Sequence, residues 1–218
     1  GRLWFVLGGG LFGFVSFERK VKKIKENNKK AEETESTTIS SMSTMSLSLT
    51  STNVIYVAID AFLGDGTSWA SPVTLQTALS NASSGDMIWI KQGTYKPTTG
   101  TSRTVYFNIP SDVSIYGGFN GTETKLDQRD WRNNLTVLSG DIGGSGETDN
   151  SDHVVYATSK SNIVLDGLVI EKGYSSTQNY GGGFYGSSLT NLTIRNCTFT
   201  YNKSDYHGGG ILLSCSSA

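Results

Sequence analysis

The stretch that decides the fold is Asn162-Ile-Val-Leu-Asp-Gly-Leu-Val-Ile170, which recurs 29 residues later as Asn191-Leu-Thr-Ile-Arg-Asn-Cys-Thr-Phe199. Both copies place apolar residues at alternating positions, the pattern of a strand with one buried face. A single strand cannot bury that face alone, whereas stacked coils bury it continuously and pair each strand with its successor. The sequence therefore predicts a repeat protein in which equivalent residues of successive coils stack.

Related runs continue the pattern on both sides. Residues 134–139 begin 28 residues before Asn162, and shorter apolar runs occur at residues 113–116 and 87–90. The triple glycines at 181–183 and 208–210 recur 27 residues apart and mark corners where a coil bends. We expect one ladder to contain Leu138 or its neighbours with Leu165 and Ile194, and another to contain Leu168 and Cys197.

These features predict an all-β fold, a right-handed parallel β-helix with a short N-terminal capping helix. A β-sandwich is disfavoured because a hairpin signal occurs only at Asn120-Gly121. The helix is expected over residues 72–82, with Ser71 as N-cap and Pro72 in the first helical position. Its apolar side chains share one face, and we expect that face to cover the open end of the core: Leu75, Ala78, Leu79 and Ala82.

The first 53 residues differ from the rest of the chain. An apolar run at residues 3–17 is shorter than the roughly 20 residues that span a bilayer, and a basic stretch follows it at residues 19–25. A signal peptide has the reverse order. Three interpretations stay open: a clipped membrane segment, a damaged signal peptide, or sequence that is not native to the protein. Residues 26–53 are rich in Ser and Thr and predict a flexible linker.

We expect the folded domain to span residues 54–218, as the N-terminal part of a β-helix that is truncated at Ala218. The 218 residues include 26 glycines and carry a net charge of −1, which favours short strands joined by tight turns and does not favour a nucleic-acid partner. Cys197 and Cys215 belong to no zinc-binding pattern. They form either one disulfide or two isolated thiols in neighbouring turns.

The entry to the predicted coils resembles pectin-lyase-like β-helix proteins. The residues that carry this resemblance are Gly64-Asp-Gly-Thr-Ser-Trp69, Leu75-Gln-Thr-Ala-Leu79, Ser84-Gly-Asp86 and Gly93-Thr-Tyr95. The middle of the chain, with Asp127-Gln-Arg-Asp-Trp131, is similar to large bacterial surface proteins that carry this domain.

From Gly181 onward the chain is similar to the repeats of chlamydial-type polymorphic outer-membrane proteins. Those repeats pair a GGA-I/L/V element with an F-x-x-N element. Phe199-Thr-Tyr-Asn202 matches the second element, and Gly208-Gly-Gly-Ile211 matches the first with Gly210 in place of Ala. The resemblance implies a β-helix and an extracellular or outer-membrane-surface location. It implies no chemistry, because this scaffold hosts lyases, hydrolases, adhesins and passenger domains.

The richest acidic stretch, residues 140–152, is a candidate calcium site. It offers Asp141, Glu147, Asp149 and Asp152 as hard oxygen ligands on a glycine-rich loop. The spacing does not match an EF-hand. The alternative is a solvated loop at one corner of a coil.

Two residues are candidates for catalysis. His153 follows the acidic loop and either acts as a base or hydrogen-bonds the backbone at the start of a strand; the same alternative holds for His207. Arg195 faces outward if Ile194 faces inward, and an outward guanidinium binds the carboxylate of a sugar acid. Its ladder neighbour is Asp166, so the alternative is a surface ion pair.

Tyrosines near the coil corners suggest carbohydrate binding, because aromatic faces stack on sugar rings; the alternative is packing over the corners. These residues are Tyr174, Tyr180, Tyr185, Tyr201 and Tyr206. Two function classes follow. The first is a non-enzymatic adhesin or passenger domain that binds polysaccharide or host-surface ligands and reaches a membrane only through an anchor elsewhere. The second is a polysaccharide lyase or glycosidase acting on acidic polysaccharide.

Overall fold

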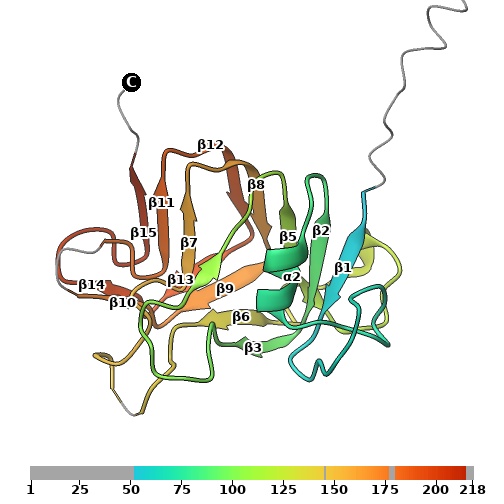
Figure 1. Ribbon diagram of the computed structural model, residues 1–218, viewed down its shortest axis with the longest axis horizontal. Helices are drawn as coiled ribbons and strands as arrows, with labels where there is room; N and C mark the ends of the chain where they lie inside the picture. The colour runs from blue at the N-terminus through green and yellow to red at the C-terminus, as the bar shows by residue number, and fades with distance from the viewer. Residues whose placement is uncertain (1–51, 145, 177–179, 215–218) are drawn as a thin grey trace, which may run out of the picture. The chain divides into compact units, whose positions relative to one another are not determined.

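The structure, a computed structural model, describes residues 52–144, 146–176 and 180–214. In these residues the chain forms five successive coils of a parallel β-solenoid (Figure 1). The predicted fold class, an all-β parallel β-helix, is confirmed. The apolar run, the basic stretch and nearly all of the Ser/Thr-rich segment lie outside the described residues. Within the described ranges, no helix has the length and apolar character needed to cross a membrane.

Each coil adds strands to parallel sheets that form the walls of the solenoid. Sheet A contains, in spatial order, β1 (Val54–Val57), β2 (Met87–Lys91), β5 (Ser114–Phe119), β8 (Ser161–Asp166) and β12 (Thr190–Arg195). Sheet B contains β3 (Gly93–Tyr95), β6 (Thr136–Ser139), β9 (Leu168–Glu171) and β13 (Thr198–Thr200). Sheet C contains β4 (Phe107–Asn108), β7 (Val155–Thr158), β11 (Phe184–Ser187) and β15 (Ile211–Ser214). A short pair joins β10 (Tyr174–Ser175) to β14 (Lys203–Ser204).

The register confirms part of the predicted ladders and corrects another part. Leu165 lies between Ile115 and Ile194 in sheet A, and all three side chains contribute to one apolar core. Leu138 was wrongly expected in this ladder, because it pairs with Ile170 in sheet B. The sequence comparison aligned residues 134–139 with the run that begins at Asn162, which forms β8 of sheet A. Residues 136–139 instead form β6 of sheet B, after a long loop.

The corners of the coils repeat as faithfully as the strands. Residues with left-handed φ recur 29 positions apart, and they are Ser159 and Ser188, Asn162 and Asn191, Gly167 and Asn196, and Lys172 and Tyr201. Asn191 donates to the side-chain oxygen of Asn162 at 2.8 Å, so the repeated asparagines also bond to each other. Asn tolerates the left-handed region better than most residues, which explains why it recurs at one of these corners.

The helix α2 (Leu75–Asn81) forms where a helix was expected, but its start and its place differ from the prediction. Its apolar face does join the core through Leu75, Ala78 and Leu79. The N-cap is Thr74, whose hydroxyl accepts the Thr77 N–H, because Val73 forms a β-bridge with Val57 and holds the preceding residues extended. The helix is not the N-terminal cap, since β1 precedes it in the chain.

Candidate functional site

One outward-facing row of sheet A crosses all five coils. The register places these side chains next to one another: Tyr56, Trp89, Tyr116, Asp166 and Arg195. The aromatic half of the row is covered, because Trp69 and Phe119 pack on it, and the Trp89 and Phe119 rings stack at a centroid distance of 4.7 Å. The polar half begins at Asp166.

The loop between β5 and β6, residues 120–135, lies beside this polar half; we call it the corner loop. It is long only in this coil. At the same corner of the next coils, Gly167 alone separates β8 from β9, and residues 196–197 separate β12 from β13. The buried carboxylate of Glu123 holds the start of the loop by accepting backbone N–H bonds from Asn120, Gly121 and Thr122 at 2.8–3.0 Å.

Two glycines of the scaffold make room for the end of the corner loop. A Cβ on Gly118, whose φ is +96°, would lie 2.5 Å from Trp131 Cα. A Cβ on Gly167, whose φ is +76°, would lie 2.6 Å from Arg129 Nη1 and 2.8 Å from Trp131 Cβ. Backbone conformation and space therefore both require glycine here, and together they fix where Arg129 and Trp131 sit.

Asp166 is the centre of a buried ionic cluster. Arg129 Nη2 and Arg195 Nε each donate to Asp166 Oδ2 at 2.7 Å, and Asn196 donates to Oδ1 at 2.9 Å. The Arg129 guanidinium also donates to the Gly117 carbonyl and lies over the Tyr116 ring, 5.3 Å from its centroid. Arg129, Arg195 and Asn196 are thus all fixed to the carboxylate of Asp166.

The cluster keeps Asp166 ionised. Burial by itself would raise the pKa of Asp166, but the hydrogen bonds from Arg129, Asn196 and Arg195 outweigh it and hold the pKa below its usual value. Both carboxylate oxygens already accept strong bonds, so this group is a structural anion rather than a proton acceptor. Arg195 uses only its Nε here. Within the described residues its Nη atoms make no hydrogen bond, and its side chain is 56 % exposed.

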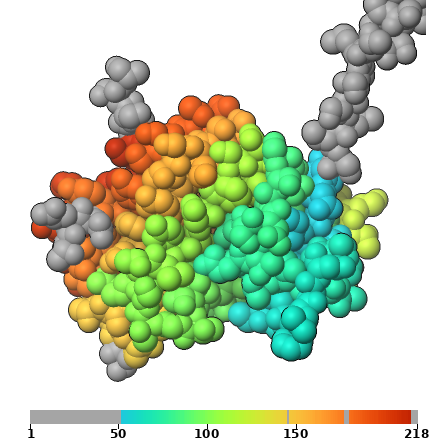
Figure 2. Space-filling view, viewed as in Figure 1, coloured from blue at the N-terminus to red at the C-terminus, as the bar shows by residue number. Residues whose placement is uncertain are grey.

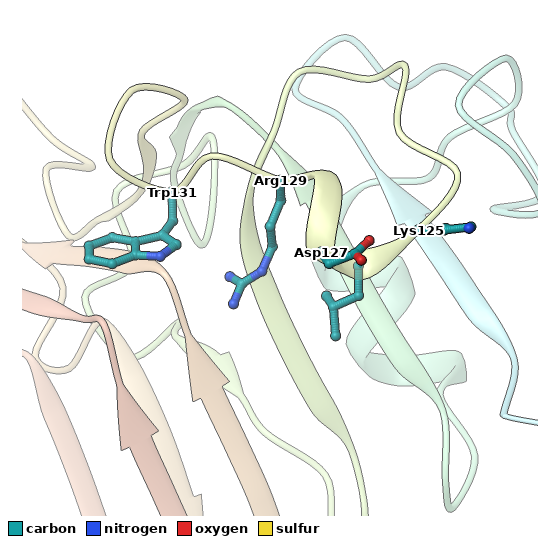
Figure 3. A pocket seen from close by; sticks show the side chains of 5 residues that line it. Lys125, Asp127, Arg129 and Trp131 are labelled. Atoms are coloured by element: carbon teal, nitrogen blue, oxygen red, sulfur yellow. The ribbon is translucent and has the colours of Figure 1, made fainter.

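Trp131 lines two hollows. One, of about 550 Å³ and open to solvent, is lined by Lys125, Leu126, Asp127, Arg129 and Trp131. In Figure 3, Arg129 and Trp131 project from the same stretch of loop to the same side, whereas Lys125 points away from them. The other, of about 240 Å³, is lined by Trp131 together with Arg132, Leu135, Gly167, Leu168, Val169, Asn196 and Thr198.

The polar groups of this surface include one exposed carboxylate, Asp127, beside the cations. Arg132 lies over the Trp131 ring at 4.1 Å from its centroid, and Lys125 is exposed. Asp130 is used within its own turn, where it accepts bonds from Asn133 and from the Arg132 N–H. The surface around Trp131 therefore combines a partly exposed aromatic ring with guanidinium groups, an arrangement that suits a planar or ring-shaped anionic ligand.

The structure confirms that Arg195 and Asp166 are neighbours, but it changes their interpretation. Asp166 was treated as half of a surface ion pair, whereas its side chain is 1 % exposed. Arg129, the second cation on Asp166, was missed because it comes from a loop distant in sequence. Its only signal was the Asp127-Gln-Arg-Asp-Trp131 motif, which pointed to a family likeness and not to a contact.

His153 lies elsewhere, at the start of β7 in sheet C, and is not brought together with Arg195 of sheet A. It is buried, and its Nδ1 is 3.0 Å from the Gly181 carbonyl oxygen. The rings of Tyr156 and Tyr185 lie within 5.6 Å of it, and burial lowers its pKa. This geometry matches the alternative stated for His153, a histidine that hydrogen-bonds the backbone beside a strand.

The first two carboxylates of the acidic loop are paired with separate lysines. Asp141 accepts a bond from Lys172 at 2.8 Å and lies 3.8 Å from Lys96. The hydrogen bond from Lys172 holds the pKa of Asp141 below its usual value. Glu147 pairs with Lys203 at 2.9 Å. A cation that bound here would have to displace these ammonium groups.

The other two carboxylates of the loop also point to different partners. Asp149 accepts the Gly144 N–H, and Asp152 pairs with Arg103 at 2.9 Å. Among the described residues, buried Asp149 Oδ1 and Asn150 Oδ1 have no hydrogen-bond partner. No three His, Cys, Asp or Glu side chains cluster around a common point within the described residues. The four carboxylates therefore do not converge on one point in this structure, and calcium binding by the loop stays a prediction.

The tyrosines named above have different surroundings. Tyr185 stacks on Tyr156, with centroids 5.4 Å apart, so part of its face is covered. Tyr174 contacts Arg103 and Lys203 through its ring. Tyr180 stacks on His207, and Tyr206 packs edge-on against Tyr180. Tyr201 is 82 % exposed. Tyr201 also lines a hollow of about 270 Å³, and Trp131, which was not among the predicted sugar-binding aromatics, lines two hollows.

Cys197 is partly buried against the core, as the predicted ladder with Leu168 requires. Its Sγ lies 3.2 Å from the Arg195 carbonyl oxygen, and burial raises its pKa. Cys215 lies outside the described residues, so the choice between a disulfide and two thiols stays open.

No protein family, curated protein or solved structure matches the chain. The parallel β-solenoid and the surface around Trp131 are therefore the observations on which a function must be based.

Proposed function

We propose that this protein is a non-enzymatic β-helix of the cell surface or of the secreted fraction, similar to an adhesin or passenger domain, and that it binds polysaccharide at the corner loop. The proposal rests on the resemblance of its repeats to polymorphic outer-membrane proteins and of its entry region to pectin-lyase-like proteins. The parallel coils are consistent with both resemblances, and the scaffold alone selects no ligand.

The observation that carries the proposal is that Trp131 lines two hollows. Arg132 lies over the ring, so part of the indole is left for a sugar ring, and the two hollows leave room for neighbouring units of a polymer. Arg132 is exposed over the ring, and Arg195, also exposed, shares Asp166 with Arg129, the residue two positions before Trp131. Guanidinium groups bind carboxylates through paired hydrogen bonds, so an acidic polysaccharide is the favoured ligand.

The alternative is a lyase or glycosidase acting on acidic polysaccharide, with Arg195 neutralising the substrate carboxylate. Such an enzyme needs a base beside that cation. Asp166 is poorly placed for this role because three donors occupy its two oxygens. His153, the other candidate, is buried at a different sheet. These observations favour binding without turnover.

Binding measurements by calorimetry with polygalacturonate and with neutral dextran test the proposal. We expect binding to polygalacturonate, weakening as salt rises, and at least about tenfold weaker binding in Trp131→Ala. Tyr206→Ala removes one of the tyrosines that the sequence suggested for carbohydrate binding, and it should bind normally if the contact is at Trp131. No binding by the unaltered protein, or equal binding by Trp131→Ala, contradicts the proposal.

A second assay separates the two function classes. The protein is incubated with polygalacturonate and calcium while the absorbance of unsaturated products is followed. We expect no increase. A clear increase that disappears in Arg195→Ala would overturn the non-enzymatic assignment and support a lyase.

A further inference from the structure

The segment between β1 and α2 exposes an apolar tip. Phe62 is 85 % exposed, Leu63 is 91 % exposed, and Ile59 next to them is also exposed. We call residues 59–63 the tip. In Figure 2 the segment that contains it, coloured cyan to teal, forms a lobe at the lower right of the folded part. Three large apolar side chains within five residues form a local patch that is unfavourable to leave in water.

The chain is constrained where the tip ends. Leu63 has a φ of 53°, a left-handed conformation that costs a non-glycine residue about 1–2 kcal/mol. A Cβ on the next residue, Gly64, would lie 1.9 Å from the Pro72 carbonyl oxygen, so the chain passes tightly against the segment before α2. Asp65 then accepts the Thr67 N–H at 3.0 Å. These contacts limit the freedom of the chain directly after Leu63, which lowers the entropic cost of docking.

A cavity of about 370 Å³ lies next to the tip. Most of its wall is apolar, with Ile59, Leu75, Tyr95, Pro97 and Phe107 among the lining residues. Its size is near the lower end of the range of about 300–1,000 Å³ found for ligand sites. Ile59 belongs to both the tip and the cavity wall, so an apolar projection and an apolar recess are adjacent on one surface.

The charges around the two features are opposite. Asp60 and Asp65 are exposed on either side of Phe62 and Leu63. Lys96, also exposed, lines the cavity, and its ammonium group lies 3.8 Å from Asp141, a carboxylate that Lys172 contacts more closely, at 2.8 Å. The acidic residues that flank the tip would repel an anionic lipid surface, whereas they would be attracted to the basic residue of this cavity.

We infer that this surface is a self-association site, in which Phe62 and Leu63 of one copy enter the cavity of a second copy and receive its tip in return. A twofold axis would relate two equivalent contacts, each between the tip of one copy and the cavity of the other. Both features of each copy are then used, so the assembly stops at a dimer. Asp60 of each copy then faces Lys96 of the other. The inference is independent of the polysaccharide-binding proposal because it uses none of the corner-loop residues.

Sedimentation equilibrium of the full chain, at concentrations up to about 1 mM, tests the inference. We expect a concentration-dependent monomer–dimer equilibrium that weakens at least about tenfold in Phe62→Ser. Tyr201→Ser removes an equally exposed aromatic elsewhere and should leave the equilibrium unchanged. All variants carry the same N-terminal residues, so differences between them report the tip. Unchanged thermal midpoints show that each variant is folded.

A charge exchange tests whether the cavity is the partner of the tip. Asp60→Lys and Lys96→Asp should each weaken the dimer, and the two together should restore it, because the opposite charges face each other again. A monomer at every concentration, or a dimer unaffected by Phe62→Ser, overturns the inference. Loss of the dimer without restoration by the double exchange also overturns it, since the tip would then dock elsewhere.

Discussion

Arg195 Nε lies 2.7 Å from Asp166 Oδ2 across the β8–β12 pair, and a second guanidinium, that of Arg129, contacts the same oxygen atom. The two arginines differ in exposure. Arg129 is 10 % exposed in its side chain, whereas Arg195 is largely in solvent. One contact is therefore inside the protein and the other at its surface, although their lengths are equal.

The first prediction follows from this difference. Arg129→Ala should lower the free energy of unfolding by about 3–5 kcal/mol, because it leaves a buried carboxylate with half of its positive charge. Arg195→Ala should cost about 1 kcal/mol or less, because solvent screens the exposed pair. Arg132→Ala, an exposed arginine without an ion pair in the described residues, is the control. Chemical denaturation measures all three, and equal losses for Arg129 and Arg195 would contradict the assignment.

The second prediction concerns pH. The pKa of Asp166 is lower in the folded protein than in the unfolded chain, so the folded state favours the ionised form. Its contribution to stability is complete above the unfolded pKa of about 4 and is lost as the pH falls through the folded pKa. Asp166→Asn should therefore be less stable than the unaltered protein at neutral pH, and the difference should narrow in acid. A difference that stays constant from pH 7 to about pH 2 would show that the ionic cluster does not act in this way.

The third prediction compares two glycines with left-handed φ. Gly85→Ala adds a Cβ where no atom lies within 4 Å, so only the backbone conformation costs energy, about 1–2 kcal/mol. Gly167→Ala carries the same cost and also meets Arg129 and Trp131, which should add about 1–3 kcal/mol. Only Gly167→Ala should also weaken polysaccharide binding, because it displaces Trp131. Denaturation and calorimetry on both variants check this, and equal effects would reject the packing argument.

The fourth prediction is calcium binding by the acidic loop. Asp149 Oδ1 and Asn150 Oδ1 make no hydrogen bond within the described residues, and hard oxygen atoms suit calcium. We expect about 5 mM calcium to raise the thermal midpoint above its value in chelator, by binding the folded state only. Asp149→Asn should remove the rise, and magnesium should replace calcium poorly. Identical midpoints in calcium and in chelator would contradict the prediction. The ion pairs with Lys172, Lys203 and Arg103 would then be what holds the loop.

The sequence was sufficient for the coils because their determinants are local and repeated. Alternating apolar residues set the inward face, and the asparagine that begins each copy marks a corner with left-handed φ. A shift of one residue would turn Leu165 and Ile194 outward, so the register from Asn162 and Asn191 onward was well determined. The error at Leu138 arose because a long loop interrupts the repeat there, so the constant spacing between equivalent residues of successive coils no longer holds.

The candidate site was only partly predictable. Arg195 and Asp166 were found because they occupy equivalent positions in adjacent coils. Arg129 and Trp131 reach the same place from the corner loop, and no periodicity relates them to β8. Their position depends on the space that Gly118 and Gly167 leave and on the bonds that Glu123 makes within the loop. The prediction of where α2 starts was wrong for a similar reason, since the β-bridge between Val73 and Val57 is a tertiary contact.

The corner loop occupies a position that Gly167 fills with one residue in the following coil. Strand pairing continues across this position whether the connection is long or short, as the β6–β9 pair shows. The strand pairing therefore tolerates a change in the length of this connection, provided that the loop still brings Arg129 to the buried carboxylate of Asp166. Ligand preference can then change in the exposed part of the insertion, whereas Arg129 links the loop to the stability of the wall.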